Sequence, residues 1–455
     1  MAPLADVLRP ACDGLVPGIK LTKPVNFATE KKLFAAVALP ILEAMSAART
    51  KLLCECRDFK KPAQNQWEET KTSFQMETYL QAATDYLSLV KGFTEHHAPP
   101  PPTTTTTTDA NDEQTSLLAS DESCEQPPPS IPFTCCEWLD LTSTTSVHSL
   151  NAHHEYAHAL LAVGCVCFHR ASDLTQVMLQ SRDFEYDEPK LKEAYNLLLR
   201  VAGLFEALLA WLGIPSSSSS TAAMSDAAMQ QWRLEQSNAA NPEVQTLQRV
   251  KDFEQGTLVR FLHGVGLAQA QELVVLRGVT RENVDYVLMG KLCMDISKRY
   301  AELTPTPKFT AWAAWKATYY AGLSAYYHGV FEWNKNEGAA CAQAIAQFQA
   351  AKDLWAKLDN NHVQRSKAIV QRDLDIATSR NQSIYHELVP DTITPLDRVG
   401  LVQSQSFPIV ASNALWKETP QPIATVKQGL SNAPAAAPPV HQVETSSGGC
   451  ACAIL

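Results

Sequence analysis

Residues 281–300 read RENVDYVLMGKLCMDISKRY, and this stretch decides the fold class. Its apolar residues form a stripe with a spacing of four and also occupy both flanks of that stripe: Val284, Leu288, Leu292 and Ile296 on it, and Val287, Met289, Cys293 and Met294 beside it. A helix that is apolar on several sides is covered by more than one neighbour. The stretch therefore predicts a helix that lies inside a stack of helices.

Helical periodicity recurs on both sides of this stretch. The further helices that it predicts are 30–57, 74–95, 152–177, 187–212, 242–277, 309–334, 339–358 and 363–386. Asp187, Glu188 and Pro189 make a good helix start. Strand character is limited to 23–27 and 399–410. Long helices joined by short turns predict an all-α fold, in which antiparallel helix pairs stack into a solenoid.

The composition excludes several classes of protein. The chain has 455 residues, of which 45% are hydrophobic, and its formal net charge is −10. It can therefore bury a sizeable core, whereas general nucleic-acid binding needs clustered Lys and Arg that are not evident here. The first twenty residues lack the apolar core of a signal peptide. We therefore expect a cytoplasmic protein whose cysteines are reduced.

Three segments differ in composition from the helical parts. Residues 98–132 are rich in Pro and Thr, 215–227 include the run Ser216–Ser220, and 417–455 are rich in Pro, Ala, Ser and Gly. Such segments cannot bury a core. We expect an N-terminal extension at 1–22, one domain at 23–416 that carries a disordered insertion and a Ser-rich loop, and a flexible tail.

The sequence His154-Glu155-Tyr156-Ala157-His158 matches the H-E-x-x-H motif, in which two histidines one helical turn apart bind zinc. A catalytic zinc also needs a third protein ligand and an open position. The extended motif with a third histidine is absent, and only Glu185 or Glu188 could replace it. A zinc metalloprotease is therefore an alternative, and we expect no enzyme activity, metal or cofactor.

The last four residues, Cys452-Ala453-Ile454-Leu455, match a C-a-a-X prenylation box, in which Leu favours geranylgeranylation of the cysteine. One lipid rarely anchors a protein stably, so a second signal is needed. We expect that Cys450 carries a second lipid or that a membrane-bound partner supplies the second contact. A soluble helical scaffold is the alternative if Cys452 is unmodified.

Several segments resemble the BRO domain family. The run Leu267-Ala268-Gln269-Ala270-Gln271-Glu272 is similar to the hallmark helix of that family. The other similar segments are Pro24–Phe27, Phe133–Leu141 with Trp138, Lys316–Gly329, Ala344–Leu358, Asn381–His386 and Val389-Pro390. The resemblance covers about residues 25–410. The insertion at 98–132 and the loop at 141–150 depart from the family pattern.

The resemblance implies a curved, banana-shaped helical domain that has tetratricopeptide-like helix pairs and a small sheet near its N-terminal end. It implies an adaptor whose concave apolar pocket binds the C-terminal amphipathic helix of ESCRT-III charged multivesicular body proteins. By position, the pocket residues fall on Glu188, Leu191, Lys192, Val274, Leu288 and Leu292. Val274 stands where the family often has an aromatic residue, which implies a shallower pocket. Without the resemblance, the apolar members of this set would be read as core residues.

Together these features predict a non-enzymatic adaptor that is tethered by its lipid to the cytoplasmic side of a membrane. The endosome, the plasma membrane and the nuclear envelope all fit that prediction. Its expected partners are ESCRT-III proteins and lipid, not nucleic acid.

Overall fold

The computed structural model describes residues 17–60, 76–96, 131–180, 187–214 and 246–419, except 19, 21, 31, 144, 305–306, 359–362, 394–395 and 409. The first part contains helices α2 (Leu39–Lys60) and α3 (Met76–His96), strands β1 (Glu137–Leu139) and β2 (Ser146–His148), and helices α4 (Ala152–Gln180) and α5 (Glu188–Trp211). The second part contains α8 (Thr257–Val279), α9 (Tyr286–Glu302), α10 (Thr310–Asn334), α11 (Gly338–Ala356), α12 (Gln364–Arg380) and α13 (Leu415–Glu418).

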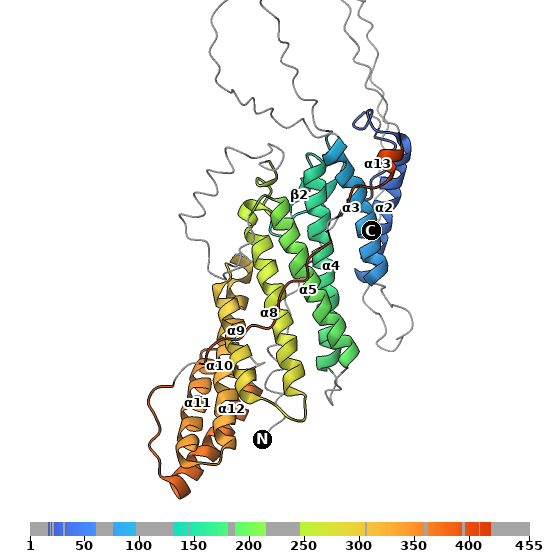
Figure 1. The fold of residues 1–455 in the computed structure, drawn as a ribbon. Coiled ribbons are helices and arrows are strands. Elements are labelled where there is room, and N and C mark those ends of the chain that lie inside the picture. The colour runs from blue at the N-terminus through green and yellow to red at the C-terminus, as the bar shows by residue number, and fades with distance from the viewer. Residues whose placement is uncertain are drawn as a thin grey trace, which may run out of the picture.

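The helices form an elongated stack in which each packs against the next one along the chain, from α2 through α12 (Figure 1). This arrangement confirms the predicted all-α solenoid. The helix that was predicted from residues 281–300 is α9. It packs against both α8 and α10, as a helix that is apolar on several sides requires.

A two-stranded antiparallel sheet pairs β1 with β2, with Trp138 opposite Val147. The expectation of a small sheet is therefore confirmed, but its residues differ from those expected. Residues 23–27 form turns and irregular structure, and only Thr22 makes an isolated bridge, to Trp138. The described residues of the second segment with strand character, 399–408 and 410, belong to no strand, because the segment crosses the helices (Figure 1).

The residue at which each helix begins depends on the side chains and backbone conformations just before it. The Asp187 side chain accepts a hydrogen bond from the Lys190 amide and caps α5, as the sequence predicts. The predicted helix at 242–277 begins late, since α8 starts only after Gln255 and Gly256 adopt left-handed conformations that interrupt helical geometry. The predicted helix at 30–57 also begins late, because turns occupy the residues before Leu39.

The segment 396–419 runs back along the molecule from α9 to α2 and α3, and we call it the strap (Figure 1). The backbone amide of Gln405 donates to the carbonyl oxygen of Leu199 on α5, at 3.1 Å. At the far end, the Trp416 indole donates to the carbonyl oxygen of Leu89 on α3, at 3.0 Å. The strap thereby ties together helices that are far apart in sequence.

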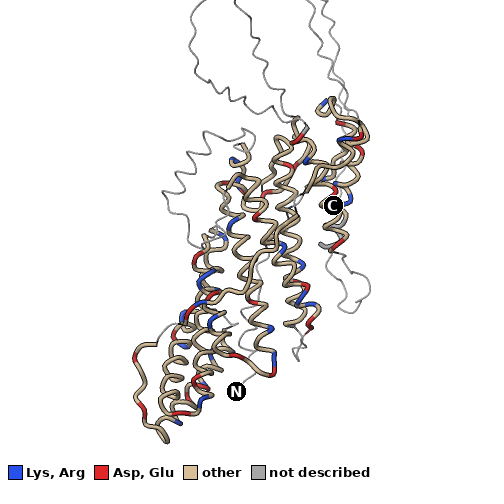
Figure 2. The backbone as a smooth tube through the Cα atoms, viewed as in Figure 1, with Lys and Arg blue, Asp and Glu red and all other residues tan. Residues whose placement is uncertain are grey.

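Acidic and basic residues are interspersed along the described helices (Figure 2). Helix α5 is long and apolar enough to cross a membrane by length and composition, the one such helix among the described residues. It packs between α4 and α8. Its apolar residues, among them Leu197, Leu204 and Leu208, are therefore part of the core.

Several predicted features lie outside the described residues. They are residues 98–130 of the insertion, the Ser-rich loop at 215–227, and Cys450 and Cys452. The proposed domain boundaries at 22 and 417 therefore stay predictions.

Candidate functional site: a pocket between α5, α8 and α9

Helices α5, α8 and α9 and the strap enclose a pocket of about 570 Å³, which we call the central pocket. Its lining includes all six residues that the sequence analysis placed in a partner-binding site: Glu188, Leu191, Lys192, Val274, Leu288 and Leu292. They come from three helices, so the fold brings together residues that are up to 104 positions apart, from Glu188 to Leu292.

The base of the pocket is apolar and tightly packed. Leu292 has no exposed surface and Leu191 is buried, so these two side chains form the floor. Leu288 and Val274 are only partly buried and form the walls. Leu288 lies one helical turn before Leu292 on α9. A ligand would therefore contact Leu288 and Val274 first, whereas Leu292 supports the cavity from below.

The position of Leu292 differs from that of Leu288. The family resemblance placed both residues in the partner-binding site. Leu292 lines the pocket but has no exposed surface, and its helix α9 packs against both α8 and α10. The groove above Leu288 nevertheless remains open, with Met289 buried beside it.

The rim of the pocket is charged. Arg277 Nη2 of α8 lies 2.5 Å from Glu188 Oε1 of α5, and both side chains are about half exposed. Lys192 and Arg281 also line the rim. Three cations therefore surround one carboxylate, which favours a ligand that carries acidic groups beside its apolar side chains.

Leu401, which was not predicted as a site residue, lines the pocket from the strap and is 55% exposed. Gln271 of α8 holds this part of the strap in place. Its Nε2 donates to the carbonyl oxygen of Val399 at 3.1 Å, and its Oε1 accepts from the amide of Leu401 at 3.3 Å. Gln271 belongs to the hallmark run at 267–272, but nothing local in the sequence indicates its partner 130 positions away.

The H-E-x-x-H match lies on α4, in the core of the molecule. The side chains of His154, Glu155 and His158 are all buried. Glu155 forms a buried ion pair with Arg49 of α2 and accepts hydrogen bonds from Tyr86, Trp138 and Ser149 at 2.7–2.8 Å. Burial alone would raise the pKa of Glu155, but the guanidinium of Arg49 and these hydrogen bonds hold it below its usual range.

The two histidines of this match are packed in the core. His154 Nε2 lies 3.0 Å from the Thr246 hydroxyl, and the His158 ring stacks on Trp138 with centroids 5.8 Å apart. Burial lowers the pKa of His158 well below its ordinary value, so the ring is neutral. A catalytic zinc needs accessible ligands and an open position. The geometry does not fit that alternative, and the Glu155 network instead joins α2, α3, β1 and α4.

Among the described residues, no three His, Cys, Asp or Glu side chains gather in an arrangement that could hold a metal. Cys165 and Cys167 are buried on α4, where they pack as small core residues.

Comparisons with known proteins identify the family and the fold. A family model for the BRO1-like domain matches residues 126–426, which include the elements of the central pocket. The chain belongs to the BRO1-like domain family. A comparison with curated protein sequences finds no significant match.

Solved structures of this family share the fold. One is the complex of the ALIX BRO1 domain with CHMP4C, at 15% identity and a TM-score of 0.56, where the match covers 88% of this chain and 98% of that one. Another is ALIX in complex with a viral late-domain peptide, at 16% identity and a TM-score of 0.55, covering 90% of this chain and 51% of ALIX. A third, on endosomal targeting by the Bro1 domain, has 14% identity and a TM-score of 0.51, covering 86% of this chain and 92% of that one.

Proposed function

We propose that this BRO1-like domain is a non-enzymatic adaptor whose central pocket binds the C-terminal amphipathic helix of ESCRT-III charged multivesicular body proteins. The observation that carries the proposal is that the six residues placed by family resemblance all line one open pocket. A similar BRO1 domain, that of ALIX, has been solved in complex with CHMP4C, which supports this class of ligand.

The pocket suits a helix-in-groove mode of binding. An amphipathic helix presents apolar side chains at i, i+3 and i+4, and these fit a groove that has the partly exposed Leu288, Val274 and Leu401 on its walls. Burying each large apolar side chain contributes about 1.5–3 kcal/mol, which association entropy partly offsets. Micromolar affinity corresponds to about −8 kcal/mol, so two or three such anchors need the charged contacts at the rim as well to reach it.

Titration of a synthetic CHMP4C C-terminal peptide into the full-length chain tests this proposal. We expect Leu288→Asp to abolish binding, because it places a carboxylate on the apolar wall. Ile376→Asp on α12 is the matched control, since Ile376 is 50% exposed and lies outside the pocket. Circular dichroism establishes that both variants stay helical. Normal binding by folded Leu288→Asp would refute the pocket assignment.

We also propose that the protein is tethered to a membrane through prenylation of Cys452, with Cys450 or a membrane-bound partner as the second contact. Within the family this arrangement resembles that of BROX, a BRO domain protein that ends in a prenylation box. The support is the Cys452–Leu455 box itself. Tethering raises the effective concentration of the pocket at a membrane that displays its ligand.

Intact-mass measurement of the protein from eukaryotic cells tests the tether. We expect a geranylgeranyl adduct that disappears in Cys452→Ser, together with a shift of the protein from the membrane fraction to the cytoplasmic fraction. Loss of membrane residence in Cys450→Ser would identify the second lipid. An unmodified wild-type mass would favour the soluble scaffold. Imaging of the wild type then distinguishes among the endosome, the plasma membrane and the nuclear envelope.

A further inference from the structure

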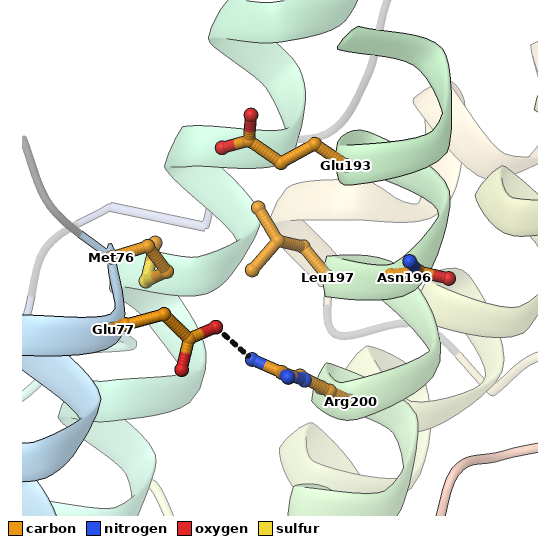
Figure 3. Close-up of a pocket in the computed structure, with 6 residues that line it drawn as sticks. All are labelled: Met76, Glu77, Glu193, Asn196, Leu197 and Arg200. Carbon is orange, nitrogen blue, oxygen red and sulfur yellow. Dashed lines mark hydrogen bonds and ion pairs between the residues drawn. The ribbon is translucent and has the colours of Figure 1, made fainter. Parts of the chain in front are cut away.

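A second pocket, of about 410 Å³, opens between the start of α3 and the middle of α5 (Figure 3). Both helices pack on α4. Because α4 lies beneath them, α3 and α5 flank a valley at this point. Met76 and Leu197 form its apolar part and are only 7% and 3% exposed. We call this the valley pocket.

Charged side chains surround that apolar part. Arg200 Nη1 of α5 lies 2.8 Å from Glu77 Oε1 of α3 and bridges the two helices, as Figure 3 shows. Glu193 lies on the opposite side of Leu197 from Arg200, as Figure 3 shows. Its Oε1 is 3.2 Å from Nε of Arg170 on α4. The lining thus carries two carboxylates and one guanidinium. The central pocket has the opposite balance, with three cations and one carboxylate.

The valley pocket and the central pocket are separated only by the exposed ridge of α5. Lys192, Asn196 and Arg200 recur every four residues and so lie along one line of that helix. Leu191 and Tyr195 face the central pocket on one flank, and Glu193 and Leu197 face the valley pocket on the other. Asn196 is exposed and lines both pockets.

A bound chain can therefore pass from one pocket to the other over Asn196. The width of one helix is roughly 10 Å, which about three extended residues span. This short reach favours a single occupant for both pockets. The opposite charge balance implies that the occupant changes character along its length, from acidic in the central pocket to basic in the valley pocket.

We propose that the valley pocket is a second subsite for the partner that occupies the central pocket, and that it takes an apolar side chain next to a basic one from the segment that flanks the partner helix. This inference rests on the proposed function, because it needs a helix in the central pocket to deliver the segment. It adds a charge requirement that the central pocket alone does not impose.

Peptide titrations into the full-length chain test the subsite. The probes are the CHMP4C C-terminal helix alone and the same helix joined through Gly-Ser-Gly to Leu-Lys-Leu, at either its N- or its C-terminus. A further probe carries Leu-Glu-Leu in place of Leu-Lys-Leu. We expect one Leu-Lys-Leu extension to bind about tenfold more tightly than the helix alone, or about 1.4 kcal/mol, and the acidic extension to lose that gain.

The double variant Glu77→Lys/Glu193→Lys is expected to remove the gain and to leave the affinity for the helix alone unchanged. Glu43→Lys/Asp375→Lys is the matched control, because it changes the net charge equally at exposed positions outside both pockets. The subsite is refuted if neither extension increases the affinity, or if the increase in affinity persists in Glu77→Lys/Glu193→Lys. In either case the Leu288-dependent binding of the helix alone would still stand. Failure of the helix alone to bind would instead refute the proposed function and the subsite with it.

Discussion

Arg277 of α8 and Glu188 of α5 form an ion pair across the mouth of the central pocket, with Nη2 2.5 Å from Oε1. The pair joins the two helices that form opposite sides of the site. A ligand helix that enters the pocket must pass beside it, so these two charges act on whichever polar residues flank the apolar anchors.

Arg277→Glu reverses the charge at this mouth. We expect the affinity for the CHMP4C peptide to fall by about tenfold or more. The carboxylates of Glu188 and of the new Glu side chain would then repel the acidic groups of the ligand that a cationic rim favours. The free energy of unfolding should change by no more than about 1 kcal/mol, since the pair is half exposed. Calorimetric titration and urea denaturation measure the two effects separately. Unchanged peptide affinity would show that the rim charges play no part in recognition.

Lys316 and Glu272 form a buried ion pair between α10 and α8, with Nζ 3.0 and 3.1 Å from the two carboxylate oxygens. We expect Lys316→Met to lower the free energy of unfolding by about 3–5 kcal/mol, because it leaves a buried carboxylate without its counter-charge. Lys316→Met/Glu272→Gln should recover part of that loss. Urea denaturation provides the measurement, and a double variant no more stable than Lys316→Met would contradict the explanation.

Burial and the neighbouring Asp252 carboxylate raise the pKa of Asp140 to about 6, from an ordinary value of 3.8. Between about pH 4 and pH 6, the Asp140 carboxyl therefore keeps its proton in the folded state, whereas it has lost that proton in the unfolded chain. The resulting stabilisation is present below about pH 4 and is lost as the pH rises through 6. Asp140→Asn mimics the protonated form, so its stability relative to the wild type should increase from pH 4 to pH 7. Urea midpoints that show a constant difference across this range would argue against the shift.

Gly203 of α5 lies against the strap, and a Cβ at this position would collide with the carbonyl oxygen of Gln405. We expect Gly203→Ala to displace the strap, to speed amide hydrogen exchange at 399–407 and to weaken peptide binding, because Leu401 loses its place on the pocket wall. Gly266→Ala on α8 is the control, since a Cβ there meets its nearest atom at 3.5 Å. Equal exchange rates in wild type and Gly203→Ala would show that the strap tolerates the displacement.

The His158 ring fills space between Trp138 and Phe253, with centroids 5.8 and 4.9 Å away. We expect His158→Ala to lower the free energy of unfolding by a few kcal/mol, on the order of other large-to-small core substitutions. Elemental analysis should show the same background zinc content in wild type and variant. A wild type that carries about one equivalent of zinc, lost in His158→Ala, would restore the metalloprotease alternative.

Local signals in the sequence predicted much of the fold. The Asp187 cap and the apolar pattern of α9 are short-range features. Helix α5 forms almost over the predicted range, whereas α9 begins at Tyr286, five residues after the predicted start, because Asp285 caps it there. The start of α8 was missed because the left-handed residues Gln255 and Gly256 interrupt a segment whose composition favours helix. The H-E-x-x-H match stayed an alternative for a related reason, since spacing along one helix says nothing about Arg49 of α2, which forms an ion pair with the Glu155 carboxylate.

By itself, the sequence determined that Leu288 and Leu292 lie one turn apart on an apolar helix, because that relation depends only on helical periodicity. Only the tertiary structure decided that Leu292 is covered while Leu288 faces an open pocket, and that Leu401 of the strap lies beside it. The physical reason is that exposure depends on which distant segments pack against a helix. Those contacts depend on the packing of the whole stack of helices, and the pattern of apolar residues along one helix does not indicate them.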